Sequence, residues 1–370
     1  MTKIRTHPHN ISSVRRRAVQ VIRGRRRAKA LAAIEQDPYA LRLAPDSIRG
    51  NRKIVLAAVK RDGWVLNQAL DPLKGDKEIV LAAVRSDGDA LTFAAEVLKR
   101  DKEVVLAAVH DKGQAFKHAD DVLKNDPAFV RSAFEINIHA YKFLPNPDLF
   151  KAEYEGIIQS LKELDIEFPS RFKELHAIKE IIENRLNPDK IDGRPLALLV
   201  YPKKDGVNVF KMNQIAELIK HGYRVLYFEA REEKDVYGAL KENTKKQKAN
   251  LFVLAGHGVQ ERTALGAEDP AAKKGEREEL YIDLSDEAEM IDLGLSNSLA
   301  GNSVIVLYSC STGKGREDGL NVAKLMKKVF PRATVFSPTK PTYLIGYVYN
   351  RKGRVAFVEY SCGRENTYIV

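Results

Sequence analysis

A repeat of 25 residues constrains the fold of this chain more than any other feature of its sequence. The segment Val55–Val59 reads Val-Leu-Ala-Ala-Val, and similar segments begin at residues 30, 80, 105 and 130. A fixed period of this size is typical of stacked repeats, in which one unit cannot bury its apolar face alone. We therefore predict an all-helical array over residues 30–147.

Each repeat is predicted to hold two short helices. Asp76 is placed to cap the first helix, over 77–86, because its carboxylate can accept hydrogen bonds from the free N–H groups of the opening turn. Gly88 is expected to end that helix through a positive φ. A second helix is expected over 89–98. Its apolar face would hold Leu91, Ala94, Ala95 and Leu98.

The array resembles an uncharacterised bacterial family of tandem helical repeats of unknown function. The resemblance covers about residues 30–145 and implies no chemistry, so the array is interpreted as a scaffold or a surface for a protein partner. The single tryptophan, Trp64, occupies a repeat position that Tyr39 and Asp89 fill elsewhere. That variability indicates a partly exposed side chain.

Residues 1–29 are predicted to be a basic arm. Of the 61 Lys and Arg residues, ten lie within 1–34, where there is no Asp or Glu, so 51 remain against 50 acidic residues. The net charge of +11 therefore belongs to the arm and does not make the whole protein a nucleic-acid binder. The arm is either a solvated lead-in, an organelle transit peptide, or a segment that contacts nucleic acid or an anionic membrane.

The apolar segments are too short for a secretory signal peptide or a membrane-spanning helix. We therefore expect a cytoplasmic protein, with non-classical export as an effector left open. The two cysteines, Cys310 and Cys362, exclude a disulfide-rich scaffold. The eight histidines show no metal-ligand spacing and no Walker-type nucleotide loop is present, so neither a metal nor a cofactor is predicted.

Residues 148–192 are predicted to be a helical connector, and a change of periodicity marks a separate domain over 193–370. Short apolar runs alternate there with amphipathic helices, which indicates a mostly parallel sheet covered on both faces. The runs are Leu196–Tyr201, Arg224–Phe228, Leu251–Leu254, Val304–Leu307 and Thr334–Phe336. A terminal hairpin is expected from 346–349 and 355–360.

Two of these runs end in reactive residues. His257 and Gly258 follow the third run, and Ser309 and Cys310 follow the fourth. Ligands of such sheets bind beyond the carboxyl ends of the strands. If the two strands are adjacent, His257 and Cys310 leave the same edge. A thiol reacts mainly as thiolate, which a nearby imidazole can hold or assist, so the pair is a candidate catalytic dyad.

These strand ends resemble the caspase-like cysteine peptidases, which include caspases, gingipains, separase and the bacterial CHAT proteins. The segment from Cys310 to Gly315 is most similar to the CHAT branch. The resemblance spans about residues 195–342, and the caspase pentapeptide around the nucleophile is absent, so no aspartate-specific caspase is implied. It implies a caspase-like α/β sandwich that acts on a protein or peptide substrate.

The same resemblance implies acyl transfer by the dyad. Cys310 would attack the scissile carbonyl, and His257 would protonate the leaving amine and then activate water. The N–H groups of Gly258 and Cys310 would form the oxyanion hole. The cationic residues Lys203, Lys204 and Lys340 lie in segments that could line a substrate pocket for an acidic side chain. Acidic residues of the 259–281 segment could instead favour a basic one; they are Glu268, Asp269, Glu276, Glu278 and Glu279.

Two other interpretations stay open. In the first, the domain is catalytically silent and uses its cleft for binding alone. In the second, the segment from Cys310 to Arg316 matches Cys-x-x-Gly-x-x-Arg, which is similar to the phosphate loop of cysteine phosphatases. The phosphatase interpretation leaves His257 unexplained.

The segment 259–281 is expected to be a mobile loop open to cleavage, including self-cleavage, near Ala271–Arg277.

Overall fold

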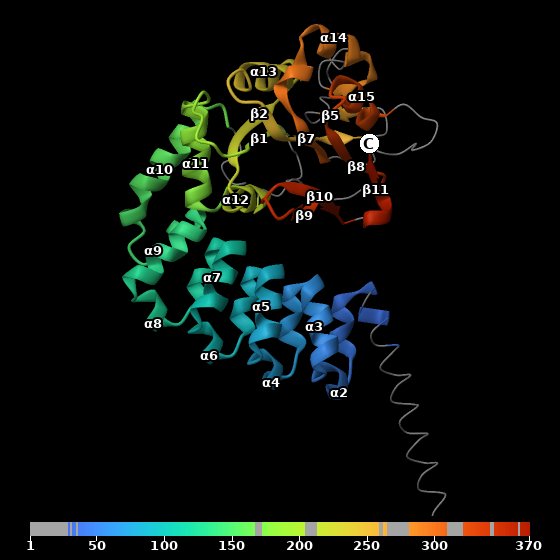
Figure 1. Ribbon diagram of the computed structural model, residues 1–370. Helices are drawn as coiled ribbons and strands as arrows, with labels where there is room; N and C mark the ends of the chain where they lie inside the picture. The colour runs from blue at the N-terminus through green and yellow to red at the C-terminus, as the bar shows by residue number, and fades with distance from the viewer. Residues whose placement is uncertain are drawn as a thin grey trace, which may run out of the picture. The chain divides into compact units, whose positions relative to one another are not determined.

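The computed structural model describes residues 29, 32–34, 36–166, 172–203, 213–258, 262–264, 281–308, 321–340, 344–361 and 363–370. The chain divides into two compact units, Met1–Ala152 and Glu153–Val370 (Figure 1). The predicted basic arm lies outside the described residues, apart from Lys29. In the part of the chain that the structure describes, no helix has the length and apolar character needed to cross a membrane.

The first unit is a stack of helical repeats, as the sequence period predicts. Within the described residues, its ten-residue helices are α3 (Arg52–Arg61), α5 (Lys77–Ser86), α7 (Lys102–Asp111) and α9 (Pro127–Ile136). The cap predicted for the first helix is confirmed, because the side chain of Asp76 accepts from the backbone N–H groups of Glu78 and Ile79. The buried face of α5 holds Ile79, Val80, Ala83 and Val84.

The second helix of each repeat differs from the prediction. Instead of one helix over 89–98, the chain forms the 3-10 helix η3 (Gly88–Phe93) and the single turn α6 (Glu96–Lys99), separated by extended Ala94 and Ala95. The cause is a hydrogen bond between repeats, because the N–H of Ala95 donates to the carbonyl of Lys74 at 2.9 Å. If Ala95 were inside a helix, its N–H would instead donate to the carbonyl four residues earlier in the same helix.

The same arrangement recurs along the array. The N–H of Leu70 donates to Arg49 O at 3.2 Å, and the N–H of Asp120 donates to Lys99 O at 3.0 Å. The corresponding 3-10 helices and single turns are η1 (Pro38–Leu43), α2 (Asp46–Arg49), η2 (Gly63–Gln68), α4 (Asp71–Lys74), η4 (Gly113–His118), α8 (Asp121–Lys124) and η5 (Ile138–Phe143).

The repeated glycines are required by close packing, and the prediction of a positive φ at Gly88 is wrong. The residues with positive φ do not include Gly63 or Gly88. A Cβ at Gly88 would lie 2.4 Å from the carbonyl oxygen of Ala108, and a Cβ at Gly63 would lie 2.1 Å from that of Ala83. Each of these oxygens belongs to the following repeat, so the glycines mark the joints where neighbouring repeats touch.

The second unit contains a six-stranded, mostly parallel sheet, which confirms the predicted change of fold class. Its order is β11-β8-β7-β3-β1-β2, and β11 alone is antiparallel to its neighbour. The strands are β1 (Leu196–Pro202), β2 (Arg224–Ala230), β3 (Ala249–Ala255), β7 (Leu299–Tyr308), β8 (Thr334–Pro338) and β11 (Thr367–Ile369). The predicted hairpin is also confirmed, as β9 (Leu344–Tyr349) and β10 (Val355–Tyr360).

Helices cover this sheet. Figure 1 shows α13 (Glu233–Asn243) and α15 (Val322–Val329) on one side of it, and α12 (Asn213–Lys220) with the hairpin on the other. The core on the first side joins alternate residues of the strands to these two helices; it includes Leu198, Leu226, Phe252, Ile305, Val236 and Met326.

The predicted connector contributes α10 (Asp148–Glu163) and α11 (Leu175–Leu186). The last turn of α11 binds the open edge of β2. Asn184 Nδ2 donates to Val225 O at 3.0 Å and Arg185 Nη1 donates to Tyr227 O at 2.6 Å. These bonds occupy carbonyl groups that an edge strand would otherwise present to another chain.

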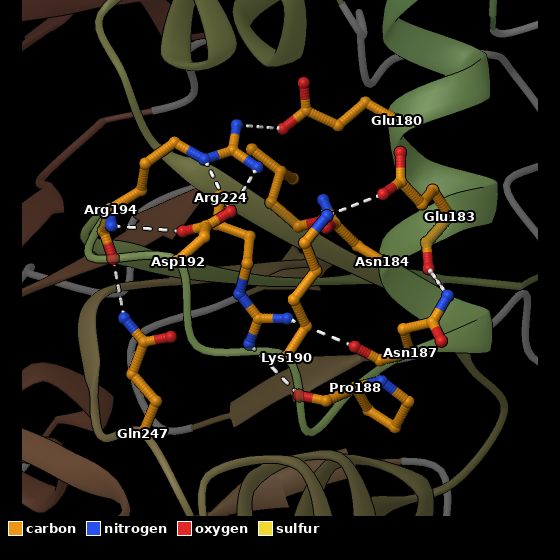
Figure 2. A network of polar contacts seen from close by, with 11 residues as sticks. Glu180, Glu183, Asn184, Asn187, Pro188, Lys190, Asp192, Arg194, Arg224 and Gln247 are labelled. Atoms are coloured by element: carbon orange, nitrogen blue, oxygen red, sulfur yellow. Dashed lines mark hydrogen bonds and ion pairs between the residues drawn. The ribbon is translucent and has the colours of Figure 1, made fainter.

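The turn after α11 is fixed by a polar network (Figure 2). Arg224 is fully buried, and its Nη2 donates to the carbonyl of Pro188 at 3.1 Å. Arg194 joins Asp192 at 2.7 Å and Glu180 at 2.5 Å. Burial lowers the pKa of Arg224 below its ordinary value, and the carboxylate of Asp192 partly opposes that shift.

Candidate active site

The strands that precede His257 and Cys310 are neighbours in the sheet. β3 and β7 are parallel and paired up to Ala255 and Tyr308. One residue further, the N–H of Gly256 donates to the carbonyl of Tyr308 at 3.1 Å. The two chain segments therefore leave the sheet side by side at its carboxyl edge, which is the adjacency on which the predicted dyad depends.

Beyond Gly256 the backbone enters a second, three-stranded antiparallel sheet. Its strands are β4 (His257–Gly258), β5 (Arg262–Ala264) and β6 (Tyr281–Asp283), with β5 in the middle. The prediction of one long loop over 259–281 is thus wrong for residues 262–264 and Tyr281. The cleavage segment proposed at Ala271–Arg277 lies outside the described residues.

The described residues include only part of the predicted site. The backbones of His257 and Gly258 are described, in β4. Ser309, Cys310 and the rest of the loop to Arg316 lie outside the described residues, as does Cys362. The structure therefore brings together the chain positions that lead to the two residues of the predicted dyad.

The three lysines predicted for a substrate pocket differ in their surroundings. Lys203 directly follows β1 and is 1% exposed; its ammonium forms an ion pair with Asp165, and its N–H donates to Ala230 O at 2.8 Å. Lys340 is exposed and lies two residues beyond the end of β8. Lys204 lies outside the described residues.

An acidic cluster at the same edge of the sheet was not predicted. Glu233 begins α13 just after β2, and its carboxyl group hydrogen-bonds Asp286, which follows β6. Burial, together with the charges of Asp286, Glu289 and Asp283, raises the pKa of Glu233 to about 8. Burial also raises the pKa of Asp286. A proton shared between these two carboxyl groups is the arrangement that such neighbours favour.

A sequence signal for part of this cluster was present. Asp283 and Asp286 have the spacing of a capping box, and the N–H of Asp283 donates to Asp286 Oδ2 at 2.8 Å. Glu233 carried no such signal, because only the fold brings it to Asp286. Within the described ranges, no three His, Cys, Asp or Glu side chains are arranged to hold a metal ion.

We expect Glu233→Gln to flatten the pH dependence of stability. The pKa of an unfolded glutamate is about 4.3, whereas the folded protein raises the pKa of Glu233 to about 8. Between these values the folded state holds a proton that the unfolded state has lost, so stability falls as pH rises through this window. The melting temperature of the variant should therefore fall less between pH 5 and pH 8.5 than that of the wild type, measured by circular dichroism.

Glu242→Gln is the matched control for this experiment, because Glu242 is an exposed glutamate on the same helix. Its pH profile should follow that of the wild type. Equal losses of melting temperature in the wild type, Glu233→Gln and Glu242→Gln would show that the pair does not share a proton in the folded state.

The comparison with known protein families concerns the repeat array. A family described as a domain of unknown function, DUF4116, matches the chain in four overlapping segments, 29–74, 51–99, 76–118 and 101–150. These segments span about a third of the chain, and they confirm the resemblance of the array to a helical repeat family of unknown function. No curated protein and no solved structure matches the chain.

Proposed function

We propose that the second unit is a caspase-like cysteine endopeptidase whose nucleophile is Cys310 and whose acid and base is His257. The pairing of β3 with β7 carries this proposal, because the N–H of Gly256 reaches the carbonyl of Tyr308 immediately before both residues. Residues that follow neighbouring parallel strands share the edge at which such sheets bind ligands. The mostly parallel sheet agrees with the fold that the resemblance implies.

The proposed reaction is acyl transfer in two steps. The thiolate of Cys310 attacks the scissile carbonyl carbon, and the carbonyl oxygen takes the electron pair. The C–N bond then breaks as the imidazolium of His257 gives its proton to the amine, which leaves a thioester. Water, losing a proton to His257, attacks the thioester, and cleavage of the C–S bond releases the acid and regenerates the thiolate.

The oxyanion of each tetrahedral intermediate would be held by the N–H groups of Gly258 and Cys310. One donor of this kind typically contributes about 2.7–4 kcal/mol to the stabilisation of the transition state. Both donors are backbone groups, so substitution of their side chains would leave the donors themselves in place. Their contribution is therefore expected to survive in His257→Ala.

Turnover of defined substrates tests this function. A fluorogenic peptide library and phenyl phosphate are incubated with the wild type, Cys310→Ala, Cys362→Ser and Arg316→Lys. Peptide hydrolysis that is lost only in Cys310→Ala supports the peptidase. Phenyl phosphate hydrolysis that is lost in Arg316→Lys supports the phosphatase loop instead. Absence of both activities, with tight peptide binding retained, supports a silent binding domain.

We further propose that the repeat array binds a protein partner or presents the substrate. Aromatic side chains on its surface support this proposal. Tyr39 and Trp64 occupy the same position in successive repeats and are 44% and 38% exposed. The ring of Trp64 packs edge-on against Phe93 at 4.9 Å, so the repeats hold its exposed face in a defined orientation. Exposed aromatic residues are enriched at the centres of protein interfaces.

Emission from Trp64 provides a direct test, because it is the only tryptophan of the chain. A protein substrate identified by turnover should shift this emission when added to Cys310→Ala. Trp64→Ala should weaken binding of that substrate at least tenfold, as is typical of a buried aromatic anchor. Leu43→Ala, at the exposed end of η1, is the control. Unchanged affinity in Trp64→Ala would remove this surface from the proposal.

A further inference from the structure

A cavity of about 300 Å³ lies at the amino-terminal edge of the main sheet, where β3 and β7 begin. This is the edge opposite the candidate active site. Lys248, immediately before β3, lines it together with Arg332, from the turn between α15 and β8. Ser296 and Asn297, from η9 (Leu295–Ser298), and Ser303, from β7, are the uncharged polar residues of its wall.

The cavity exists because β7 bulges away from β3. In the pairing of the two strands, Ala249 lies opposite Leu299 and Leu251 lies opposite Val304. One residue of β3 therefore faces four residues of β7, over 300–303. Extra residues of this kind leave the ladder locally, and bulges recur next to functional sites. Here the bulged residues Ala300, Gly301 and Ser303 form one wall of the cavity.

The charges around the cavity have one sign. Of the described residues that line it, two are cationic, Lys248 and Arg332, and none is acidic. Both side chains are exposed, and neither forms an ion pair with another described residue. A concave wall with two uncompensated cations attracts anions, because low-dielectric walls focus the field of the charges.

A buried hydroxyl group points to the same class of ligand. Ser303 is 2% exposed, and its Oγ has no hydrogen-bond partner. Buried hydroxyl groups nearly always have a partner, and one left without it is costly. Because Ser303 lines the cavity, a ligand oxygen there would give its hydroxyl an acceptor.

We propose that this cavity binds a small organic anion, whose phosphate or carboxylate group is held by Lys248 and Arg332 and accepts a hydrogen bond from Ser303. The planar guanidinium of arginine matches the oxygens of either group. The volume lies at the lower end of the range for ligand pockets, which favours a small molecule over a bare ion. The site uses no residue of the proposed dyad, so it stands or falls independently of peptidase activity.

Calorimetric titration of the full chain tests this site. The probes are glycerol phosphate and citrate, each at constant ionic strength set with sodium chloride. We expect one-to-one binding of at least one probe. Lys248→Gln and Arg332→Gln should each weaken that binding about tenfold, the usual effect of losing one charge-assisted hydrogen bond. Ser303→Ala should weaken it several-fold without loss of thermal stability, because this hydroxyl has no partner within the protein.

Lys241→Gln and Arg351→Gln are the matched controls, because they remove the same charges from exposed positions away from the cavity. Both should bind the probe as the wild type does. Binding of glycerol phosphate alone assigns a phosphorylated ligand, and binding of citrate alone assigns a carboxylate. The proposal is overturned if neither probe binds. It is also overturned if the double variant of Lys248→Gln and Arg332→Gln binds like the wild type, because binding would then come from another part of the chain, such as the basic arm.

Discussion

Treatment of the full chain with a peptide-like electrophile is expected to modify Cys310 far faster than Cys362. The reason is that only Cys310 follows a strand whose neighbour leads to a histidine, and the backbone pairing of β3 with β7 continues to Gly256 and Tyr308. A thiolate held by an imidazole reacts faster than a thiol with its ordinary pKa. Mass spectrometry of the digested protein would identify the modified cysteine.

His257→Ala should slow the labelling of Cys310 by about 10²- to 10⁴-fold, the usual contribution of a positioned acid or base. The labelling of Cys362 in the same sample is the internal control and should not change. Circular dichroism should show that the variant is folded. Equal labelling of both cysteines, insensitive to His257, would contradict the dyad and with it the proposed peptidase.

Ala83→Asp is expected to unfold the repeat array. Ala83 is fully buried in α5, and its carbonyl oxygen lies at the joint with Gly63 of the preceding repeat. An uncompensated charge at such a position costs about 3–5 kcal/mol, a large share of the roughly 5–15 kcal/mol by which a domain is stable. The measurement is thermal unfolding of the full chain, followed by the emission of Trp64, which lies within the array.

Ala57→Asp is the matched control for this prediction. Ala57 lies in the preceding ten-residue helix, α3, but its side chain is exposed. The same change there costs only the difference in helix propensity, at most about 0.7 kcal/mol. If both variants melt like the wild type, Ala83 is not in the packed interior of the array; if both unfold, the effect is one of helix propensity rather than of burial.

The first helix of each repeat could be predicted from the sequence, whereas the second could not. Asp76 caps α5, and the apolar residues of that helix repeat with the period of a helix, so its beginning and its buried face could be predicted. The positive φ at Gly88 that was expected to end it is absent. Ala94 and Ala95 are good helix formers by propensity. They are extended because Ala95 binds Lys74 of the preceding repeat. A bond between repeats has no signature in the local sequence, so propensity predicted the wrong conformation.

The candidate site shows the same division. The apolar runs before His257 and Cys310 predicted two strands, and the structure confirms that these strands are neighbours. The small sheet beyond them was missed because β5 and β6 have three residues each, which is too short for an alternation of polar and apolar residues to be recognised. The pair of Glu233 and Asp286 was missed because the two residues meet only in the folded chain.

The joint between repeats also determines how the array can change in evolution. Two joints combine such a bond, from Ala95 to Lys74 or from Asp120 to Lys99, with a glycine, Gly63 or Gly88, that admits the next backbone. A tandem duplication of 25 residues would copy a whole joint and leave the existing ones intact. An insertion of any other length would place a side chain where the glycine must be. The array is therefore free to lengthen or shorten only by whole repeats, and the surface that we propose as a binding surface would grow by one row of residues each time.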